Sequence, residues 1–264
     1  MLAYNGPTTQ ETTRRKISSD VLNSLINRAE TGKHPRLLSK LSELHWMLLQ
    51  GWKLDEASQP DQVVIGLGRL LTVVAEQDFL SYPVRFQATL ITSAVSMLRS
   101  LTNVSSEMLQ LLDQWARPVT ICTQACLIQL PRLLQADETN QAAVCVTALC
   151  LSLLRQLLVL MKDHQPSHAL TAIQETFLLQ SIVSTIQLTI HYRNGWEVAE
   201  ASFTVLHAVA QSNAGSAVLT SLQLEQSLWL PLEVIYHVQV VHCLFTFGDW
   251  LILFFFVFFS VSMF

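Results

Sequence analysis

Five cysteines are the side chains in this sequence with the widest chemistry, because a thiolate can bind a metal, form a disulfide or attack an electrophile. Cys122 with Cys126 and Cys145 with Cys150 have helical spacing, and Cys243 stands alone. Zinc sites normally use tighter pairs, joined by a second pair or by histidines. All five lie in apolar segments and their number is odd. The thiols are therefore predicted to be reduced, small core residues in the cytosol or nucleus.

The histidines offer one further candidate pair. His164 and His168 have the spacing of two metal ligands on one helical turn, but Pro166 lies between them and breaks the helix that would align them. Both are predicted to be solvated loop histidines. The remaining isolated histidines on predicted helices are interpreted as polar-edge or hydrogen-bonded core residues: His45, His191 and His207.

Other short motifs have structural explanations. Gly66-x-Gly68 lacks the third glycine and the preceding strand of a dinucleotide-binding turn, so a close contact between helices is expected. Asp137 and Glu138 stand at a predicted helix start, where negative charge complements the helix dipole. No Gly-x-Ser-x-Gly, P-loop or His-Glu-x-x-His motif occurs. The sequence predicts no enzyme, no catalytic residues, and no cofactor or metal site.

These residues lie on a succession of predicted amphipathic helices. Ser18 or Ser19 can cap a first helix with the apolar stripe Val21, Leu22, Leu25, Ile26 and Ala29, which Gly32 ends. Pro35 suits the start of a second helix with Leu37, Leu41, Leu44 and Leu48 on one side. Tyr82-Pro83 begins a further helix, Pro131 is expected to perturb the helix over 118–135, and Asn194-Gly195 ends the helix over 167–191. The other later helices are predicted over 62–77, 105–115, 138–162, 197–211 and 216–228.

The segment 138–162 is apolar nearly all round, which is typical of a central core helix or of a membrane span. Arg155 and Gln156 stand in its middle. An arginine there would cost about 2.5–3.5 kcal/mol in a bilayer. We therefore predict a core helix.

Composition limits the classes of function. Charged residues make up 14% of the chain and the net charge is −4, which argues against a surface for nucleic acid. Arg14-Arg15-Lys16 is the only basic cluster and is interpreted as a solvated lead into the first helix. The polar N-terminus has no hydrophobic signal segment, so secretion is not expected.

The predicted fold is all-α, an irregular α-solenoid of armadillo/HEAT-like helical hairpins, because each hairpin needs its neighbours to bury its second face. A compact helical bundle is the alternative. Residues 1–16 are predicted to be a flexible lead, 17–232 the solenoid segment, and 233–264 a hydrophobic, phenylalanine-rich tail.

That tail differs in composition from the rest of the chain. Eight of the twelve phenylalanines lie at or after Phe245, and Trp250 to Phe264 is apolar except for Ser260 and Ser262. A membrane span needs about 20 apolar residues, and this run is shorter. Three interpretations stay open: translated read-through of a thymine-rich tract in an alternative transcript, a tail anchor, and a buried core segment.

Two phrases carry a family resemblance, Val64-Ile65-Gly66-Leu67-Gly68-Arg69-Leu70-Leu71 and Asp78-Phe79-Leu80-Ser81-Tyr82-Pro83-Val84-Arg85-Phe86-Gln87. With the later helix through Ala199, Ser202 and Phe203, they resemble the C-terminal region of the large α-solenoid scaffold nucleoporins of the nuclear pore inner ring. The resemblance covers roughly 1–232. It implies a structural protein of the nuclear pore complex at the nuclear envelope, in the form of a truncated or alternative isoform. It also implies a role in nucleocytoplasmic transport of protein and mRNA and in passage of inner-membrane proteins.

The partners implied are other nucleoporins, particularly a linker nucleoporin that docks a short helix on the solenoid, and the family has no catalytic residues. Partner helices are expected to enter a groove between hairpins. Trp46, Trp52 and Trp196 are candidates for that face, although core placement is favoured for each. The alternatives are an armadillo-type adaptor unrelated to the pore, and a tail-anchored membrane protein with 250–264 inserted.

Overall fold

A computed structural model describes residues 26–27, 41, 60–101, 104–136, 141–162 and 168–222. Within these ranges every regular element is a helix, so the all-α prediction is confirmed. The elements are α3 (Pro60–Glu76), the short 3-10 helix η1 (Phe79–Ser81), α4 (Val84–Ser100), α5 (Ser106–Asp113), α6 (Ala116–Gln135), α7 (Gln141–Met161), α8 (His168–Glu175), α9 (Leu178–Tyr192), α10 (Trp196–Ala210) and α11 (Asn213–Ser221).

Most predicted helices in this part of the chain agree with the structure to within a few residues. Ile26 and Leu41, which were assigned to the apolar stripes of the first two helices, are helical and buried. The structure does not describe the rest of those two helices or the tail from 233 to 264. Six other residues considered in the sequence also lie outside the described ranges: His45, Trp46, Trp52, Asp137, Glu138 and His164. The proposed boundaries of the lead and the tail lie outside them as well.

The prediction of one helix over 167–191 was wrong. The structure divides it into α8 and α9 at Phe177, whose backbone is left-handed with φ 53°. The Thr176 hydroxyl donates a hydrogen bond to the Ala172 carbonyl oxygen at 2.8 Å. No glycine or proline marks this break.

Two other boundaries also differ. The left-handed residue that ends α9 is Arg193, with φ 52°, whereas Gly195, with φ 74°, precedes α10. The last described helix, α11, begins at Asn213 because the Ser212 hydroxyl accepts a hydrogen bond from the Gly215 amide at 3.0 Å. Helix α6 continues through Pro131 to Gln135.

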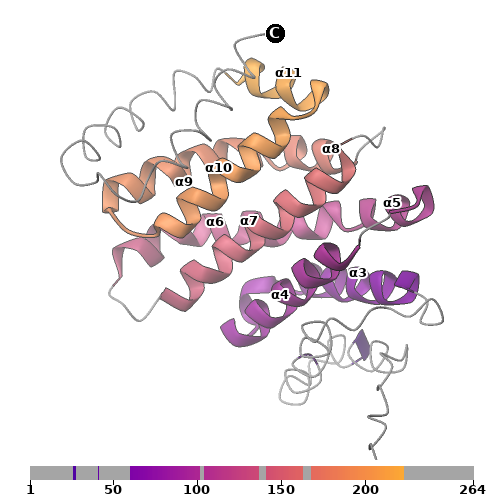
Figure 1. Ribbon diagram of the computed structural model, residues 1–264. Helices are drawn as coiled ribbons and strands as arrows, with labels where there is room; N and C mark the ends of the chain where they lie inside the picture. The colour runs from indigo at the N-terminus through magenta and orange to yellow at the C-terminus, as the bar shows by residue number, and fades with distance from the viewer. Residues whose placement is uncertain are drawn as a thin grey trace, which may run out of the picture.

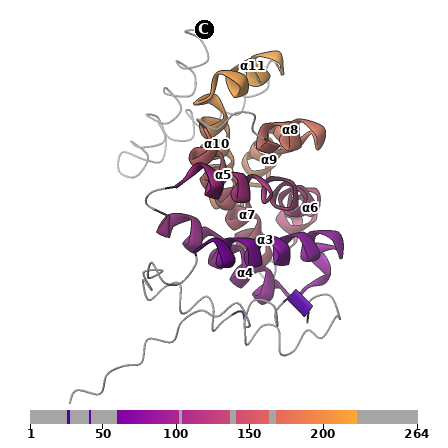
Figure 2. The ribbon, with the colours of Figure 1, turned by 90° about the vertical axis from the view of Figure 1, so that its right-hand side faces the viewer.

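The long helices are stacked in layers, each made of one hairpin. Helices α3 and α4 form the first layer, α6 and α7 the second, and α9 and α10 the third (Figure 1). Helix α6 contacts both α3 and α9, while α7 contacts both α4 and α10. The side view shows the same order, with α5 and α8 beside the stack and α11 beyond α10 (Figure 2). Each long helix thus packs on the third helix before or after it.

Side-chain hydrogen bonds join successive layers. The Trp115 indole N–H donates to the Val64 carbonyl oxygen, 51 residues earlier. The side-chain amide of Gln124 donates to the Ser181 hydroxyl, and that of Gln135 donates to the Tyr192 hydroxyl. Each of these two bonds joins a residue of α6 to the residue 57 positions later in α9. Because the separation is the same at both points, α6 and α9 run parallel.

Helix α7 occupies the centre of the stack. Its side chains face α4, α6 and α10, and ten of its residues are buried, among them Leu151, Leu154 and Leu157. Of the helices described, α7 is the one that is long and apolar enough to cross a membrane by length and composition. In this structure it is packed on three sides by helices, as the core interpretation of 138–162 predicted.

The turn between the first two long helices is held by one buried side chain. The side-chain amide of Gln87 donates hydrogen bonds to the backbone carbonyl oxygens of Phe79, at 3.0 Å, and Tyr82, at 2.8 Å. The Tyr82 and Phe86 rings stack with their centroids 5.0 Å apart. The second sequence segment of the family resemblance, Asp78 to Gln87, thus forms η1 and the first turn of α4, and these contacts hold it in place.

Candidate protein-interaction surface

The thiols lie mostly in the core, as expected. Cys122, Cys126 and Cys150 are buried between α6 and α7. Burial, reinforced by the neighbouring Cys126, raises the pKa of the Cys122 thiol, which is therefore neutral at physiological pH. Cys145 departs from the prediction because it is exposed on α7. Cys243 lies outside the described residues.

The described histidines are not brought together. The His168 amide donates to the Asp113 carboxylate at 3.0 Å, and its imidazole Nδ1 lies 3.1 Å from the same carboxylate, so this histidine links the start of α8 to the end of α5. His191 packs edge-on against Tyr192. His207 is half-buried, and burial together with the Arg155 charge lowers its pKa. Within the described residues, no group of three His, Cys, Asp or Glu side chains could hold a metal ion.

Gly68 makes the close helix contact that the sequence indicated. A Cβ atom at this position would lie 2.5 Å from the Trp115 indole nitrogen, far inside any real contact distance. The absence of a side chain lets the buried indole lie against α3 and donate its hydrogen bond to Val64. This glycine serves packing between the first and second layers.

The exposed apolar side chains are the features of the described surface that packing does not explain. Ile128 and Phe177 are each 68% exposed, and Trp196 is 44% exposed. Core placement, which was favoured for Trp196, is therefore wrong, because this residue begins α10 directly after the left-handed Gly195 and lies at the end of the hairpin. Ile65 and Val84 are exposed to a smaller degree.

Phe177 is unusual for its backbone as well as its exposure. A bulky residue in the left-handed region is a genuine outlier, and the conformation costs about 1–2 kcal/mol. The exposed ring recovers little of this cost through burial. Phe177 falls inside the single helix that was predicted over 167–191, and Ile128 inside the helix predicted over 118–135.

Ile128 and Phe177 flank one contact between layers. Ile128 follows Gln124 by one helical turn, Phe177 precedes Ser181 by one turn, and the Gln124 amide donates to the Ser181 hydroxyl at 3.0 Å. The side-chain oxygen Oε1 of Gln124 is buried and has no hydrogen-bond partner in the structure. These four residues are called the α6–α9 seam below.

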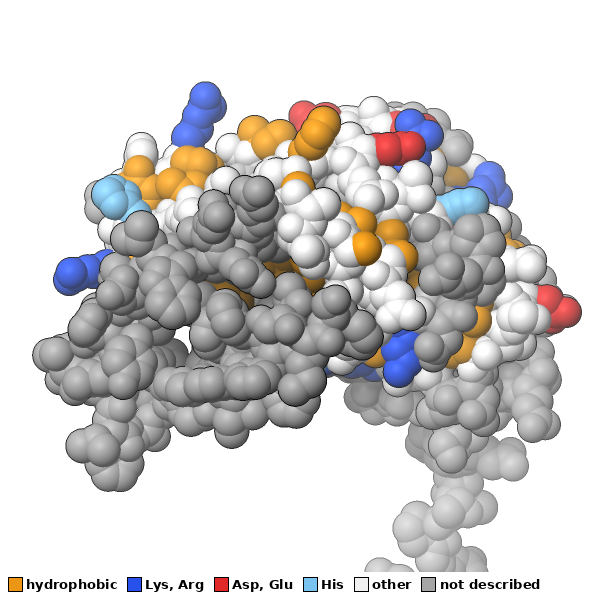
Figure 3. All heavy atoms as spheres, turned by 90° about the horizontal axis from the view of Figure 1, so that it is seen from above, with side chains coloured by type: hydrophobic (Ala, Val, Ile, Leu, Met, Phe, Trp, Pro, Cys, Tyr) orange, Lys and Arg blue, Asp and Glu red, His pale blue; other side chains and the backbone are white. Residues whose placement is uncertain are grey.

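Figure 3 shows one face of the molecule, on which apolar side chains lie among uncharged polar ones and charged side chains are scattered between them. This agrees with a chain in which only 14% of residues are charged. A partner would therefore be recognised mainly by apolar contact and hydrogen bonding.

Searches of protein-family models, of curated proteins and of solved structures found no match to this chain.

Proposed function

We propose that this chain is a segment of an irregular α-solenoid of armadillo/HEAT type that acts as a protein-binding scaffold. The observation that carries the proposal is the stacking of each long helix on its third neighbour, α3 with α6 with α9 and α4 with α7 with α10. In a compact bundle helices gather round a common centre, whereas repeated hairpins in one direction build an extended stack. The short helices α5 and α8 come before equivalent hairpins, which supports a repeating unit of three helices.

The α6–α9 seam is the surface that we assign to partner binding. Large apolar side chains are anchors at protein interfaces, where a helix can place its own apolar face between two hairpins. Phe177 and Ile128 supply two such anchors on successive layers. The strained backbone of Phe177 gives a second reason, since such strain is concentrated at functional sites.

We further propose that the scaffold belongs to the inner ring of the nuclear pore, and that its partners are other nucleoporins, particularly a linker nucleoporin that docks a short helix. The support is the sequence resemblance of the segments that form α3, the η1–α4 turn and α10. An adaptor of the same architecture outside the pore is the second candidate, since the stacking favours both equally.

The test is affinity capture of the tagged full chain from cell extract, with mass spectrometry of the proteins recovered. We expect inner-ring nucleoporins, the linker nucleoporin among them, and a fluorescent fusion at the nuclear rim. Other reproducible partners would favour the adaptor. Chaperones alone would show that this chain does not support a scaffold. A tail-dependent membrane pellet after carbonate extraction, without aggregates, would favour the tail anchor.

A pair of variants tests the surface itself. Phe177→Asn removes the ring but keeps a residue that tolerates the left-handed backbone, so partner recovery is expected to fall at least tenfold without loss of stability. Val84→Asn changes an exposed apolar residue in the first layer and serves as the matched control. Equal recovery with Phe177→Asn and with Val84→Asn would remove the α6–α9 seam from the proposal.

A further inference from the structure

Two buried thiols face each other across the hairpin of the second layer. The sulfur of Cys126 on α6 lies 3.9 Å from the sulfur of Cys150 on α7. Both cysteines are free, and both side chains are almost fully buried. A disulfide requires the sulfurs to lie about 2.05 Å apart, so bond formation needs an approach of about 1.9 Å.

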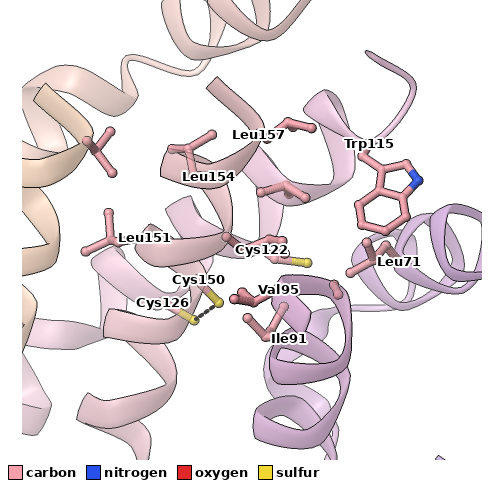
Figure 4. Packing of buried hydrophobic residues seen from close by; sticks show 14 of the residues in the cluster. Leu71, Ile91, Val95, Trp115, Cys122, Cys126, Cys150, Leu151, Leu154 and Leu157 are labelled. Carbon is pink, nitrogen blue, oxygen red and sulfur yellow. Dashed lines mark hydrogen bonds between the residues drawn. The ribbon is translucent and has the colours of Figure 1, made fainter. Parts of the chain in front are cut away.

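The surroundings of this pair are apolar. Figure 4 shows the two sulfurs between Ile91 and Val95 of α4 and Leu151 of α7, with Cys122 nearby. The hydrogen bond with Cys126, then burial, raise the pKa of the Cys150 thiol, and among the described residues the charges that act on it are those of Cys126 and Cys122. At rest Cys150 is therefore held as the neutral thiol, so its thiolate is a small fraction that grows with pH, whereas an uncharged disulfide suits the site.

We propose that Cys126 and Cys150 form an intramolecular redox site, in which hydrogen peroxide converts the two thiols into a disulfide between α6 and α7. In the first step the small thiolate fraction of one cysteine attacks a peroxide oxygen. The O–O bond breaks, hydroxide leaves and takes up a proton to become water, and the cysteine becomes a sulfenic acid.

In the second step the sulfur of the other cysteine attacks the sulfenic sulfur. The S–S bond forms, the S–O bond breaks, and the thiol proton leaves with the oxygen as a second water. The two thiols together lose two electrons and the peroxide gains them. Because the second sulfur already touches the first, the disulfide forms before the polar sulfenic acid is oxidised further.

The position of the bond gives it a structural consequence. It would join two helices of the central layer whose cysteines are 24 residues apart in sequence. Helices α6 and α7 contact the layers on both sides. A cross-link here restricts the unfolded chain and fixes the hairpin on which α3, α4, α9 and α10 pack. Oxidation is therefore expected to raise the thermal unfolding midpoint.

The test treats the reduced full chain with hydrogen peroxide, unfolds it, blocks the remaining thiols with N-ethylmaleimide and assigns linked peptides by tandem mass spectrometry. We expect two fewer blocked thiols and a link between Cys126 and Cys150. Because only the thiolate attacks, the rate should rise about tenfold per pH unit between pH 7 and pH 8. Dithiothreitol should restore both thiols and the original unfolding midpoint.

Matched variants and an unfolded control make the result specific. Cys145→Ser removes the exposed thiol of α7 and should leave the link intact, whereas Cys150→Ser should abolish it. The chain unfolded in guanidinium should lose the preference for this pair. Links through Cys145 or Cys122 in the folded protein would overturn the proposal, as would unchanged Cys126 and Cys150 at peroxide doses that oxidise Cys145.

Discussion

At the scale of single residues, the contact between Gly68 and Trp115 fixes how the first two layers fit together. The indole is 1% exposed, and its N–H donates to Val64 at 3.2 Å. A methyl group at position 68 would collide with the ring, which cannot withdraw without giving up this hydrogen bond. We therefore expect Gly68→Ala to lower the free energy of unfolding by about 1–3 kcal/mol, as overpacking does in other cores. Chemical denaturation measures this directly.

A double-mutant cycle separates that collision from a change in helix propensity. Alanine alone favours a helix over glycine by about 1 kcal/mol, so a loss of stability in Gly68→Ala has to come from packing. In the Trp115→Phe background the smaller ring leaves room for the methyl group, and the same substitution should become neutral or stabilising. Equal costs in both backgrounds would mean that the indole is not the obstacle.

His207 provides a residue whose charge is disfavoured by the fold. Burial and then the Arg155 charge lower its pKa below the usual 6.5, while its Nδ1 atom is buried without a hydrogen-bond partner in the structure. As pH falls through 6.5 the unfolded chain takes up the proton first, so stability is lost towards acid and is fully present above pH 7. We expect His207→Gln to reduce the fall in the urea midpoint between pH 7.5 and pH 5.5. An identical fall in both proteins would contradict this assignment.

At the scale of elements, much could be predicted from the sequence because hydrophobic periodicity and turn residues acted together. Pro83 marks the start of α4, and the segment 138–162, apolar on nearly every side, identified the central helix α7. The break at Phe177 was missed because no glycine or proline announces it. The apolar spacing does not announce it either, because buried Ala172 and buried Leu179 are seven residues apart, a spacing that one continuous helix face also gives.

The candidate surface was harder to predict because it depends on tertiary placement. Phe177 was placed inside one predicted apolar helix, and nothing in the sequence sets Ile128 apart from the buried Leu127 and Leu130 beside it. Their exposure depends on how α6 and the break between α8 and α9 are placed in the folded chain. The same reasoning applies to Trp196, whose exposure is set by its position at the end of a hairpin.

The caps of the short helices give a test at this scale. Ser105 accepts a hydrogen bond from the Met108 amide at 3.2 Å at the start of α5, and Ser212 accepts one from the Gly215 amide at 3.0 Å at the start of α11. Replacing either serine by alanine should cost about 1 kcal/mol of helix stability. Helix α5 packs on α3 and α7, whereas α11 packs mainly on α10. We therefore expect Ser212→Ala to accelerate amide exchange locally in α11, and Ser105→Ala to lower global stability. Exchange that rises throughout the protein with Ser212→Ala would show that α11 is part of the cooperative core.

At the scale of the whole molecule, a stack of hairpins carries stability between neighbouring layers. Leu154 lies fully buried on α7, which contacts both the layer before it and the layer after it. Leu154→Ala should cost about 2–5 kcal/mol, and amide exchange should become faster in α4, α6 and α10 together. Leu219→Ala removes a similarly buried side chain from α11 and is the matched control, with faster exchange expected in α11 and α10 alone. If both variants accelerated exchange equally in every helix, the molecule would unfold as one cooperative unit, as a compact bundle does. The three-helix repeat would then not be a separate unit of stability.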